Sequence, residues 1–349
     1  MAIELNGRFL MQPITGVQRF AREAMAAINA RDPNLLRLIV PSNVSDEHLP
    51  NDRMNVSRGQ LRGHLWEQLE LPIQSRGHFL VNLCNTAPVC IRHQLVVLHD
   101  VAFLARPENF SRRFRYWYRA MVFGYLTRGA QLATVSRFSA TQIAEQFNYP
   151  LSKIFVVSEG SEHISKIMPD DSLVVAHALR DRPFALAVSS VVASKNFGAV
   201  AEAAKTLEGN VRIVAVGRKP DSRVFTNTKL TSDKLIYLGY VTDAQLRALY
   251  EAATCFVFPS FYEGFGLPAV EAMRCGCPVI VSREGALHEV CEDAALYCDA
   301  RDPSSVAQAI LRIVNNPILR SELIEAGKMQ AFKFSWNATA ERLMHLLPA

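Results

Sequence analysis

Short apolar runs alternate with helical patterns along almost the whole 349-residue chain, in two successive series. The first series of predicted strands covers 2–5, 35–40, 79–82, 95–98, 132–135 and 154–157. The second series covers 184–189, 211–216, 235–238, 254–258, 278–281 and 295–298. Most runs are apolar throughout, which is typical of parallel strands covered on both faces. Predicted helices lie between many of them, at 16–30, 137–147, 195–207, 243–252, 267–275 and 303–314.

This repetition predicts two doubly wound α/β domains. A polar, irregular segment at 158–183 separates the two series. We therefore expect an N-terminal domain over 1–165 and a C-terminal domain over 166–334.

The composition is that of an ordinary globular protein, with 49% hydrophobic and 20% charged residues. No apolar run of about 20 residues predicts a spanning helix, and the N-terminus does not resemble a signal peptide. The seven cysteines, an odd number, favour a reducing compartment. Residues 1–170 hold 19 Lys and Arg against 14 Asp and Glu, which is the whole net charge of +5. The first half is therefore expected to face an anionic partner.

The most specific motif runs from Pro259 to Met273, after an apolar strand and at the start of a helix. Gly264 and Gly266 let a ligand approach the backbone closely. The helix begins just after these glycines, so the N–H groups of Phe265, Gly266 and Leu267 have no partner within the helix. They predict an anion site at its positive end.

Two acids, Glu263 and Glu271, flank this anion site. They fit a ligand with hydroxyl groups on both sides of its phosphates, which describes a nucleotide sugar. Two alternatives stay open at this point. The acids can be solvated beside a capped helix, or the G-x-G-x-x-A spacing can belong to a dinucleotide enzyme, although it stands late in the chain for that pattern.

The segment resembles the E-x7-E motif of GT-B glycosyltransferases of family GT4, and the resemblance covers nearly the whole chain. It implies two Rossmann-like domains facing across a cleft, with the C-terminal helix, 335–349, packed on the first domain. It also implies that Glu263 binds donor-sugar hydroxyls, that Glu271 binds the ribose, and that the glycine loop contacts the sugar and the diphosphate. The implied reaction retains anomeric configuration, and no cofactor or essential metal is expected.

Two further segments resemble donor-binding parts of the family. Ser189–Asn196 ends a strand and opens a helix, so that Lys195 would neutralise the diphosphate and Asn196 would lie beside it. Ser194 stands where the family often has Arg, and Arg218 or Lys219 would compensate. In Leu238–Asp243, the backbone of Tyr240 and Val241 would contact the base, although Thr242 or Asp243 also caps the next helix.

In the first half, Gly16 resembles the N-terminal glycine loop of the family, with a plain strand-to-helix turn as the alternative. His99 follows a predicted strand at the edge where ligands of α/β sheets bind. The resemblance places this His near the donor sugar, and a structural His is the alternative. Polar residues in 63–68 and 82–88 are weaker candidates for an acceptor pocket.

The stretch Phe110–Arg119 is both basic and aromatic. Arg112, Arg113, Arg115 and Trp117 are candidates for contact with an anionic membrane or a lipid-linked acceptor. A half-buried helix with solvated arginines explains the pattern equally well. Nucleic-acid binding is a weaker alternative, because no accompanying motif supports it.

Together these patterns predict a retaining glycosyltransferase of bacterial surface polysaccharide synthesis. The first candidate donor is GDP-mannose, and the expected acceptor is an oligosaccharide or a lipid-linked glycan. The expected location is the cytoplasm, at the inner face of the plasma membrane. A UDP-sugar transferase of the same fold, a nucleotide-sugar epimerase and a non-catalytic sugar-nucleotide-binding protein are the alternatives.

Overall fold

The computed structural model describes residues 3–50, 54–189, 193–217 and 234–348. Arg218 and Lys219 therefore lie outside the described residues. The chain forms two compact units. The first comprises Met1–Gly160 and Ser335–Ala349, and the second comprises Ser161–Phe334. Within the described ranges, no helix is long and apolar enough to cross a bilayer.

The first unit is built on a seven-stranded sheet with the order β3-β2-β1-β4-β5-β6-β7. Every strand pair is parallel. Its strands are β1 (Ile3–Asn6), β2 (Leu36–Val40), β3 (Asn55–Arg58), β4 (Phe79–Asn82), β5 (Gln94–Val97), β6 (Gln131–Thr134) and β7 (Ile154–Val156). The sequence analysis missed β3. It is an edge strand of partly exposed, largely polar residues, so it lacks the apolar run that marks the others.

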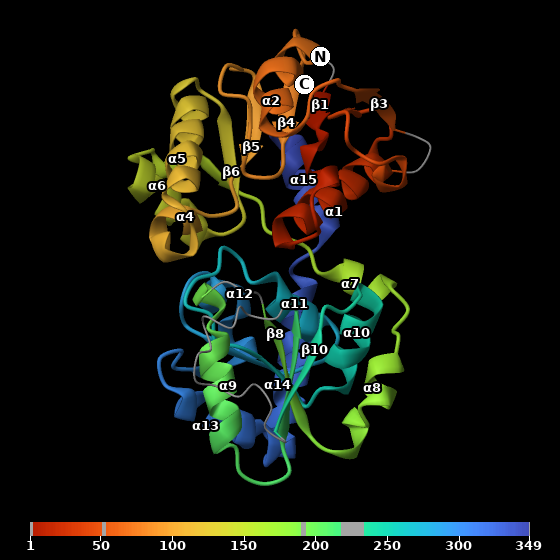
Figure 1. The fold of residues 1–349 in the computed structure, drawn as a ribbon, viewed down its shortest axis with the longest axis vertical. Helices are drawn as coiled ribbons and strands as arrows, with labels where there is room; N and C mark the ends of the chain where they lie inside the picture. Colours follow the sequence, from red (N-terminus) through yellow and green to blue (C-terminus); the bar gives the residue numbers. More distant parts are fainter. Residues whose placement is uncertain (1–2, 51–53, 190–192, 218–233, 349) are drawn as a thin grey trace. The chain divides into compact units, whose positions relative to one another are not determined.

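Helices cover this sheet (Figure 1). They are α1 (Gly16–Arg31), α2 (Gly63–Leu65), α3 (Leu71–Gln74), α4 (Ala102–Ala105), α5 (Arg112–Thr127), α6 (Arg137–Phe147) and α15 (Trp336–His345). A π-helical segment, Trp66–Glu70, joins α2 to α3. The C-terminal helix α15 packs against α1, where the Phe20 and Trp336 rings meet edge to face at 5.9 Å. The ends of the chain therefore share one hydrophobic core.

The second unit has a six-stranded sheet with the order β10-β9-β8-β11-β12-β13, again with every pair parallel. Its strands are β8 (Phe184–Ser189), β9 (Arg212–Gly217), β10 (Leu235–Gly239), β11 (Cys255–Phe258), β12 (Val279–Ser282) and β13 (Ala295–Cys298). Its helices are α7 (Glu162–Lys166), α8 (Ser172–Ala176), α9 (Phe197–Thr206), α10 (Asp243–Ala252), α11 (Leu267–Arg274), α12 (Leu287–Cys291), α13 (Pro303–Val314) and α14 (Pro317–Phe332).

Figure 1 draws α9 and α13 on one side of this sheet and α8 and α10 on the other. The prediction of one helix over 195–207 was wrong at its start. Asn196 has a left-handed backbone, φ +54°, which separates a 3₁₀ turn (Ala193–Lys195) from α9. This break leaves Lys195 on a loop at the carboxyl end of β8. The carboxyl ends of the other strands of the sheet lie at the same edge, which is where ligands of doubly wound sheets bind.

Candidate functional site

The turn between β11 and α11 is held in a conformation that requires glycine. Gly266 precedes α11 with φ +100°, in the left-handed region that other residues rarely adopt. A Cβ on Gly266 would stand 2.5 Å from Cδ2 of Leu287. The side chains of Phe265 and Leu267 are buried. The Phe265 and Leu267 side chains are therefore not offered to a ligand, and the N–H groups of the turn stand at the positive end of α11.

Lys195 and Glu263 form a close ion pair beside this turn. The Nζ atom of Lys195 is 2.6 Å from both Oε1 and Oε2 of Glu263. The Glu263 side chain is 7% exposed, whereas that of Lys195 is 28% exposed. The ammonium also lies 5.1 Å from the centroid of the Phe258 ring. The structure thus brings together two residues that the sequence separates widely, with the cation on the accessible side.

The backbone of Glu263 is fixed by the loop after β12. Ala286 donates its N–H to the carbonyl oxygen of Glu263 at 3.0 Å. A Cβ on Gly285, which has φ +67°, would stand 2.6 Å from the Glu263 nitrogen and 2.7 Å from its oxygen. This close approach holds the Glu263 backbone in place. The sequence analysis did not single out Gly285.

Glu271 lies one turn inside α11 and is buried. Its Oε1 is 2.9 Å from Nε2 of His163, and its Oε2 accepts a hydrogen bond from the Tyr250 hydroxyl at 3.4 Å. Burial, together with the Glu271 charge, raises the pKa of Tyr250 well above its ordinary value, so the phenol stays protonated and can donate. His163 was missed because it lies 108 positions from Glu271 in sequence. Tyr250 lies 21 positions from Glu271, but no pattern around it marks it as a partner.

The other predicted donor residues lie in varied environments. The Asn196 amide donates to the carbonyl oxygens of Pro259 and Ala300, at 3.0 and 2.6 Å, so it holds the β8 loop against the β11 loop. Tyr240 is 84% exposed, and Val241 is half-buried. Thr242 caps α10 by accepting from Gln245, which is the capping role that the sequence left open.

In the first unit, His99 is buried beneath the sheet edge. Its Nε2 is 3.0 Å from the Leu83 carbonyl oxygen, so this nitrogen carries the proton and donates. Its Nδ1 lies 3.6 Å from Oε1 of Glu159. The Phe20 ring meets the imidazole edge to face at 4.8 Å. The side chain is thus held by neighbours of its own unit on several sides.

Gly16 is the first residue of α1 and is exposed. A Cβ there would meet no atom within 4 Å, and φ is not positive. Nothing in the described fold therefore requires glycine at this position. A requirement for glycine here, if an assay finds one, comes from a ligand.

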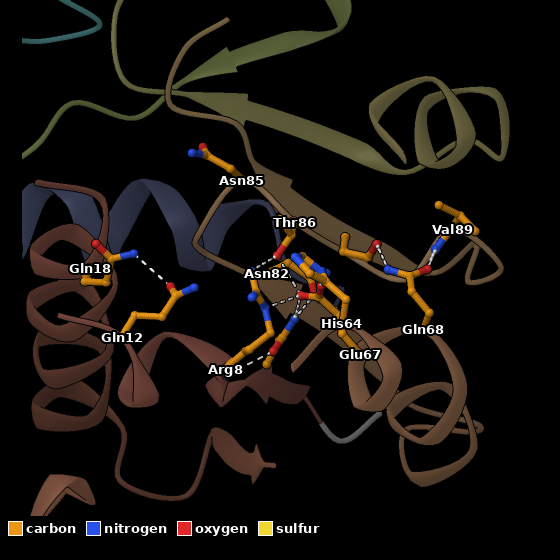
Figure 2. A network of polar contacts seen from close by, with 12 residues as sticks. Arg8, Gln12, Gln18, His64, Glu67, Gln68, Asn82, Asn85, Thr86 and Val89 are labelled. Carbon is orange, nitrogen blue, oxygen red and sulfur yellow. Dashed lines mark hydrogen bonds and ion pairs between the residues drawn. The ribbon is translucent and has the colours of Figure 1, made fainter. Parts of the chain in front are cut away.

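A buried polar network lies in the first unit (Figure 2). We call it the Glu67 network, and its members are Asn6, Arg8, His64, Glu67, Asn82 and Thr86. Oε1 of Glu67 accepts from Asn6 Nδ2 at 3.0 Å, from Arg8 Nε at 3.1 Å and from Thr86 at 2.6 Å. Oε2 lies 3.0 Å from His64 Nδ1. Asn82 accepts from Asn6 and so ties the network to β4.

Glu67 is fully buried but remains charged. Burial by itself would raise its pKa, but the hydrogen bond from His64 and the charge of Arg8 outweigh burial, together with the bonds from Thr86 and Asn6. The pKa of Glu67 is therefore below its ordinary value. The residue lies in the π-helical segment Trp66–Glu70, a rare geometry that often marks functional sites. The sequence analysis named this stretch only as a weak acceptor candidate and missed Arg8.

The basic and aromatic stretch forms the first half of α5. Phe110, Phe114 and Tyr118 stack in a column, with centroids 5.3 and 4.1 Å apart. Trp117 is exposed and meets the His64 ring edge to face at 5.8 Å. Arg112 and Arg113 are exposed, and Arg115 is half-buried. Part of the aromatic pattern is thus structural, while Arg112, Arg113 and Trp117 are exposed.

All seven cysteines are free. Burial raises the pKa of Cys255, Cys275 and Cys291 to about 12, so these groups are thiols at neutral pH. Among the residues that the structure describes, no group of three His, Cys, Asp or Glu side chains is arranged to hold a metal ion.

Comparison with known proteins places this architecture among sugar-transferring enzymes. A family model described as "Glycosyl transferases group 1" matches residues 173–330. The chain is 33% identical to the O-antigen chain mannosyltransferase B of Escherichia coli, with 95% of both chains covered. It is 27% identical to the O-antigen chain mannosyltransferase RfbU of Salmonella typhimurium, over 77% of this chain and 76% of that one.

Solved structures agree with the fold. WaaG, a glycosyltransferase involved in lipopolysaccharide biosynthesis, superposes with a TM-score of 0.75 at 13% identity over 100% of both chains. Anabaena HepE in complex with UDP and glucose superposes with a TM-score of 0.76 at 16% identity over 99% of both chains. At these identities the likeness concerns the fold alone, and it confirms the predicted GT-B class of two Rossmann-like domains. With the full-length relative at 33% identity, it follows that the chain belongs to the group 1 glycosyl transferases and is a glycosyltransferase, as the E-x7-E motif predicted.

Proposed function

We propose that this enzyme transfers mannose from GDP-mannose to a growing bacterial surface polysaccharide, with an oligosaccharide or a lipid-linked glycan as acceptor. The identity of 33% over 95% of an O-antigen mannosyltransferase supports both the sugar and the type of polymer. RfbU, the second relative, is also a mannosyltransferase of an O-antigen chain. A UDP-sugar is the alternative donor, because the HepE neighbour was crystallised with UDP and glucose.

The observation that carries the proposal is the Lys195–Glu263 pair beside the amide-lined turn at the start of α11. As the bond between sugar and phosphate breaks, negative charge grows on the diphosphate. Lys195 and the N–H groups of Gly266 and Leu267 stabilise this charge without rearrangement. Glu263, with its backbone fixed by Gly285, accepts hydroxyl hydrogens of the sugar and holds Lys195 in place until the diphosphate arrives.

The reaction proposed retains configuration. The acceptor hydroxyl attacks the same face of the sugar that the diphosphate leaves, and its proton passes to a leaving phosphate oxygen. No covalent enzyme intermediate and no essential metal form part of the proposal. Glu271, oriented by His163 and Tyr250, accepts hydrogen bonds from the ribose hydroxyls. The backbone of the exposed Tyr240 and of Val241 contacts the base.

The first unit is proposed to hold the acceptor. Its excess of positive charge suits an anionic lipid surface, and the exposed arginines of α5 with Trp117 are the proposed contact. The proposed location is therefore the inner face of the plasma membrane. In this unit, Gly16 is proposed to approach the diphosphate, and His99 is proposed to lie near the donor sugar.

The first experiment identifies the donor by thermal shift with a panel of nucleotide sugars, since a ligand that binds the folded state raises the melting temperature. GDP-mannose is expected to give the largest shift. A larger shift with a UDP-sugar, followed by transfer from it, would replace the donor in this proposal.

The second experiment tests the site itself. Removal of one pre-organised group that stabilises developing charge typically lowers kcat about 10²–10³-fold. We expect that loss in Lys195→Met and a comparable loss in Glu263→Gln. The matched control is Glu284→Gln, because Glu284 is also a paired acid near this loop, at 2.7 Å from Arg301, but makes no contact with Lys195. Near-normal transfer in Lys195→Met would remove the pair from the reaction.

A further inference from the structure

A cavity of about 320 Å³ lies on the surface of the first unit between α4 and α5. Arginines supply most of its lining: Arg112, Arg115 and Arg119 share one face of α5, at spacings of three and four residues. Tyr116 adds a hydroxyl, and Leu104 of α4 forms an apolar wall. The lining thus presents hydrogen-bond donors and positive charge, with no carboxylate.

These arginines have no anionic partner of their own. Within the described ranges, none of Arg112, Arg115 and Arg119, nor their neighbour Arg113, makes an ion pair. Nε of Arg115 is buried and has no hydrogen-bond partner. Elsewhere on the surface, some arginines meet an acid, as Arg301 meets Glu284 and Arg247 meets Glu251. The charge on α5 is therefore left uncompensated.

The position of these arginines at the start of α5 further destabilises the chain when no ligand is bound. The first turn of α5 contains Arg112 and Arg113 and no acidic residue. The N-terminus of a helix carries a partial positive charge, which disfavours cations and favours anions. A cluster of arginines in the first two turns therefore weakens the helix unless an anion binds there. This cost, placed beside a cavity, is the signature of a site for a negatively charged ligand.

We propose that this α5 cavity binds a diphosphate group. The guanidinium groups can form paired hydrogen bonds to phosphate oxygens, and three of them balance the several charges that a diphosphate carries. The cavity is at the lower end of small-molecule sites in volume, which suits a compact anion. Two sources share this chemistry: the diphosphate of a polyprenyl-linked acceptor, in which case the inference rests on the proposed function, or free diphosphate.

The test is a calorimetric titration of the full chain with inorganic pyrophosphate. Because the proposed donor site would also bind diphosphate, every titration uses the Lys195→Met background. In that background, Arg115→Gln or Arg119→Gln should weaken binding about tenfold or more, as expected for the loss of a charge-assisted hydrogen bond. The matched control is Arg113→Gln, which removes the same charge from the same helix but does not line the cavity. It should weaken binding less than about threefold, because only long-range attraction is lost.

Each outcome decides the inference. Tenfold weakening by Arg115→Gln with near-normal binding in Arg113→Gln supports the cavity. Equal weakening by both changes means diffuse surface charge, and an absence of pyrophosphate binding overturns the inference directly. Circular dichroism and the melting temperature establish that each variant is folded; if Arg115→Gln is not, the exposed Arg112 and Arg119 serve in its place.

Vesicles distinguish the two sources. Sedimentation with phosphatidylcholine vesicles is compared with vesicles that also contain phosphatidylglycerol or a polyprenyl diphosphate. Arg115-dependent binding only to the diphosphate lipid identifies a lipid-linked ligand. Arg115-dependent binding of pyrophosphate but not of that lipid identifies a free one. A third outcome refutes the cavity: the protein binds phosphatidylglycerol vesicles, Arg113→Gln and Arg115→Gln weaken this binding equally, and the polyprenyl diphosphate does not increase it. Failure of sugar transfer with an intact cavity response would instead count against the proposed function.

Discussion

The Glu67 network offers the sharpest test of the energetics described above. Arg8 and Glu67 are both buried, and their side chains meet at 3.1 Å. Removing one member of such a pair leaves the other charge buried without its counter-ion, which costs about 3–5 kcal/mol. We therefore expect Arg8→Met and Glu67→Gln each to lower the free energy of unfolding of the first unit by about 3 kcal/mol or more.

The double variant separates the ion pair from the rest of the network. When both charges are removed, no uncompensated ion remains, so the loss should be clearly smaller than the sum of the two single losses. The coupling energy of contacting residues in one network reaches about 3 kcal/mol. The residual loss in the double variant reports the bonds to Glu67 from its neutral partners, Asn6 and Thr86.

The assay is urea unfolding followed by tryptophan fluorescence. All three tryptophans, Trp66, Trp117 and Trp336, belong to the first unit, so the signal reports that unit and not the second. With a slope of about 1–3 kcal/mol per molar urea, a 3 kcal/mol loss moves the midpoint by about 1–3 M. Single losses that simply add in the double variant would refute the buried ion pair.

The same network predicts a dependence on pH. The pKa of Glu67 is lower in the folded state than in the unfolded chain, where it is about 4.3. Its stabilisation is therefore fully present above that value and is lost as the pH falls through the folded pKa. Between about pH 5 and pH 3, the wild-type first unit should lose more stability than Glu67→Gln does. Parallel pH profiles would contradict the lowered pKa.

Two glycine substitutions test the site from different directions. Gly285→Ala should cost about 1–3 kcal/mol of strain, displace Glu263 and reduce kcat. Gly276→Ala imposes similar left-handed strain, at φ +73°, but its Cβ would meet side chains alone, the flexible end of Lys328 at 3.3 Å and Ile324 at 3.9 Å. Equal kcat losses in Gly285→Ala and Gly276→Ala would therefore show that the position of Gly285 beside Glu263 does not matter. Gly16→Ala should raise stability by about 0.4–1 kcal/mol, since its Cβ meets nothing, yet lower kcat/KM about tenfold if a ligand passes closely. Normal kcat/KM in Gly16→Ala would show that no ligand passes close to this position. Gly198→Ala on α9 is the control that changes stability alone.

Local patterns in the sequence were sufficient to predict much of the fold. Buried parallel strands must be apolar on both faces, so β8, β11 and β12 stand out as continuous apolar runs, and every predicted strand is present. The one described strand that was not predicted, β3, is an edge strand whose polar residues carry no such signal. The break at Asn196 was equally hidden, because a left-handed residue in an otherwise helical pattern is decided by its tertiary bonds to Pro259 and Ala300.

The motif around Glu263 could be recognised from sequence because its parts are local: a strand, a turn that requires glycine and a helix start follow one another. That local order, with the overall alternation of strands and helices, determined the fold class and the enzyme family. The partners of the motif could not be recognised in this way. His163 reaches Glu271 across 108 positions, and Arg8 reaches Glu67 across 59, so only the packed tertiary structure decided which buried polar side chains meet. The physical reason is that polar pairing depends on distance in space, whereas sequence patterns report only the secondary structure nearby.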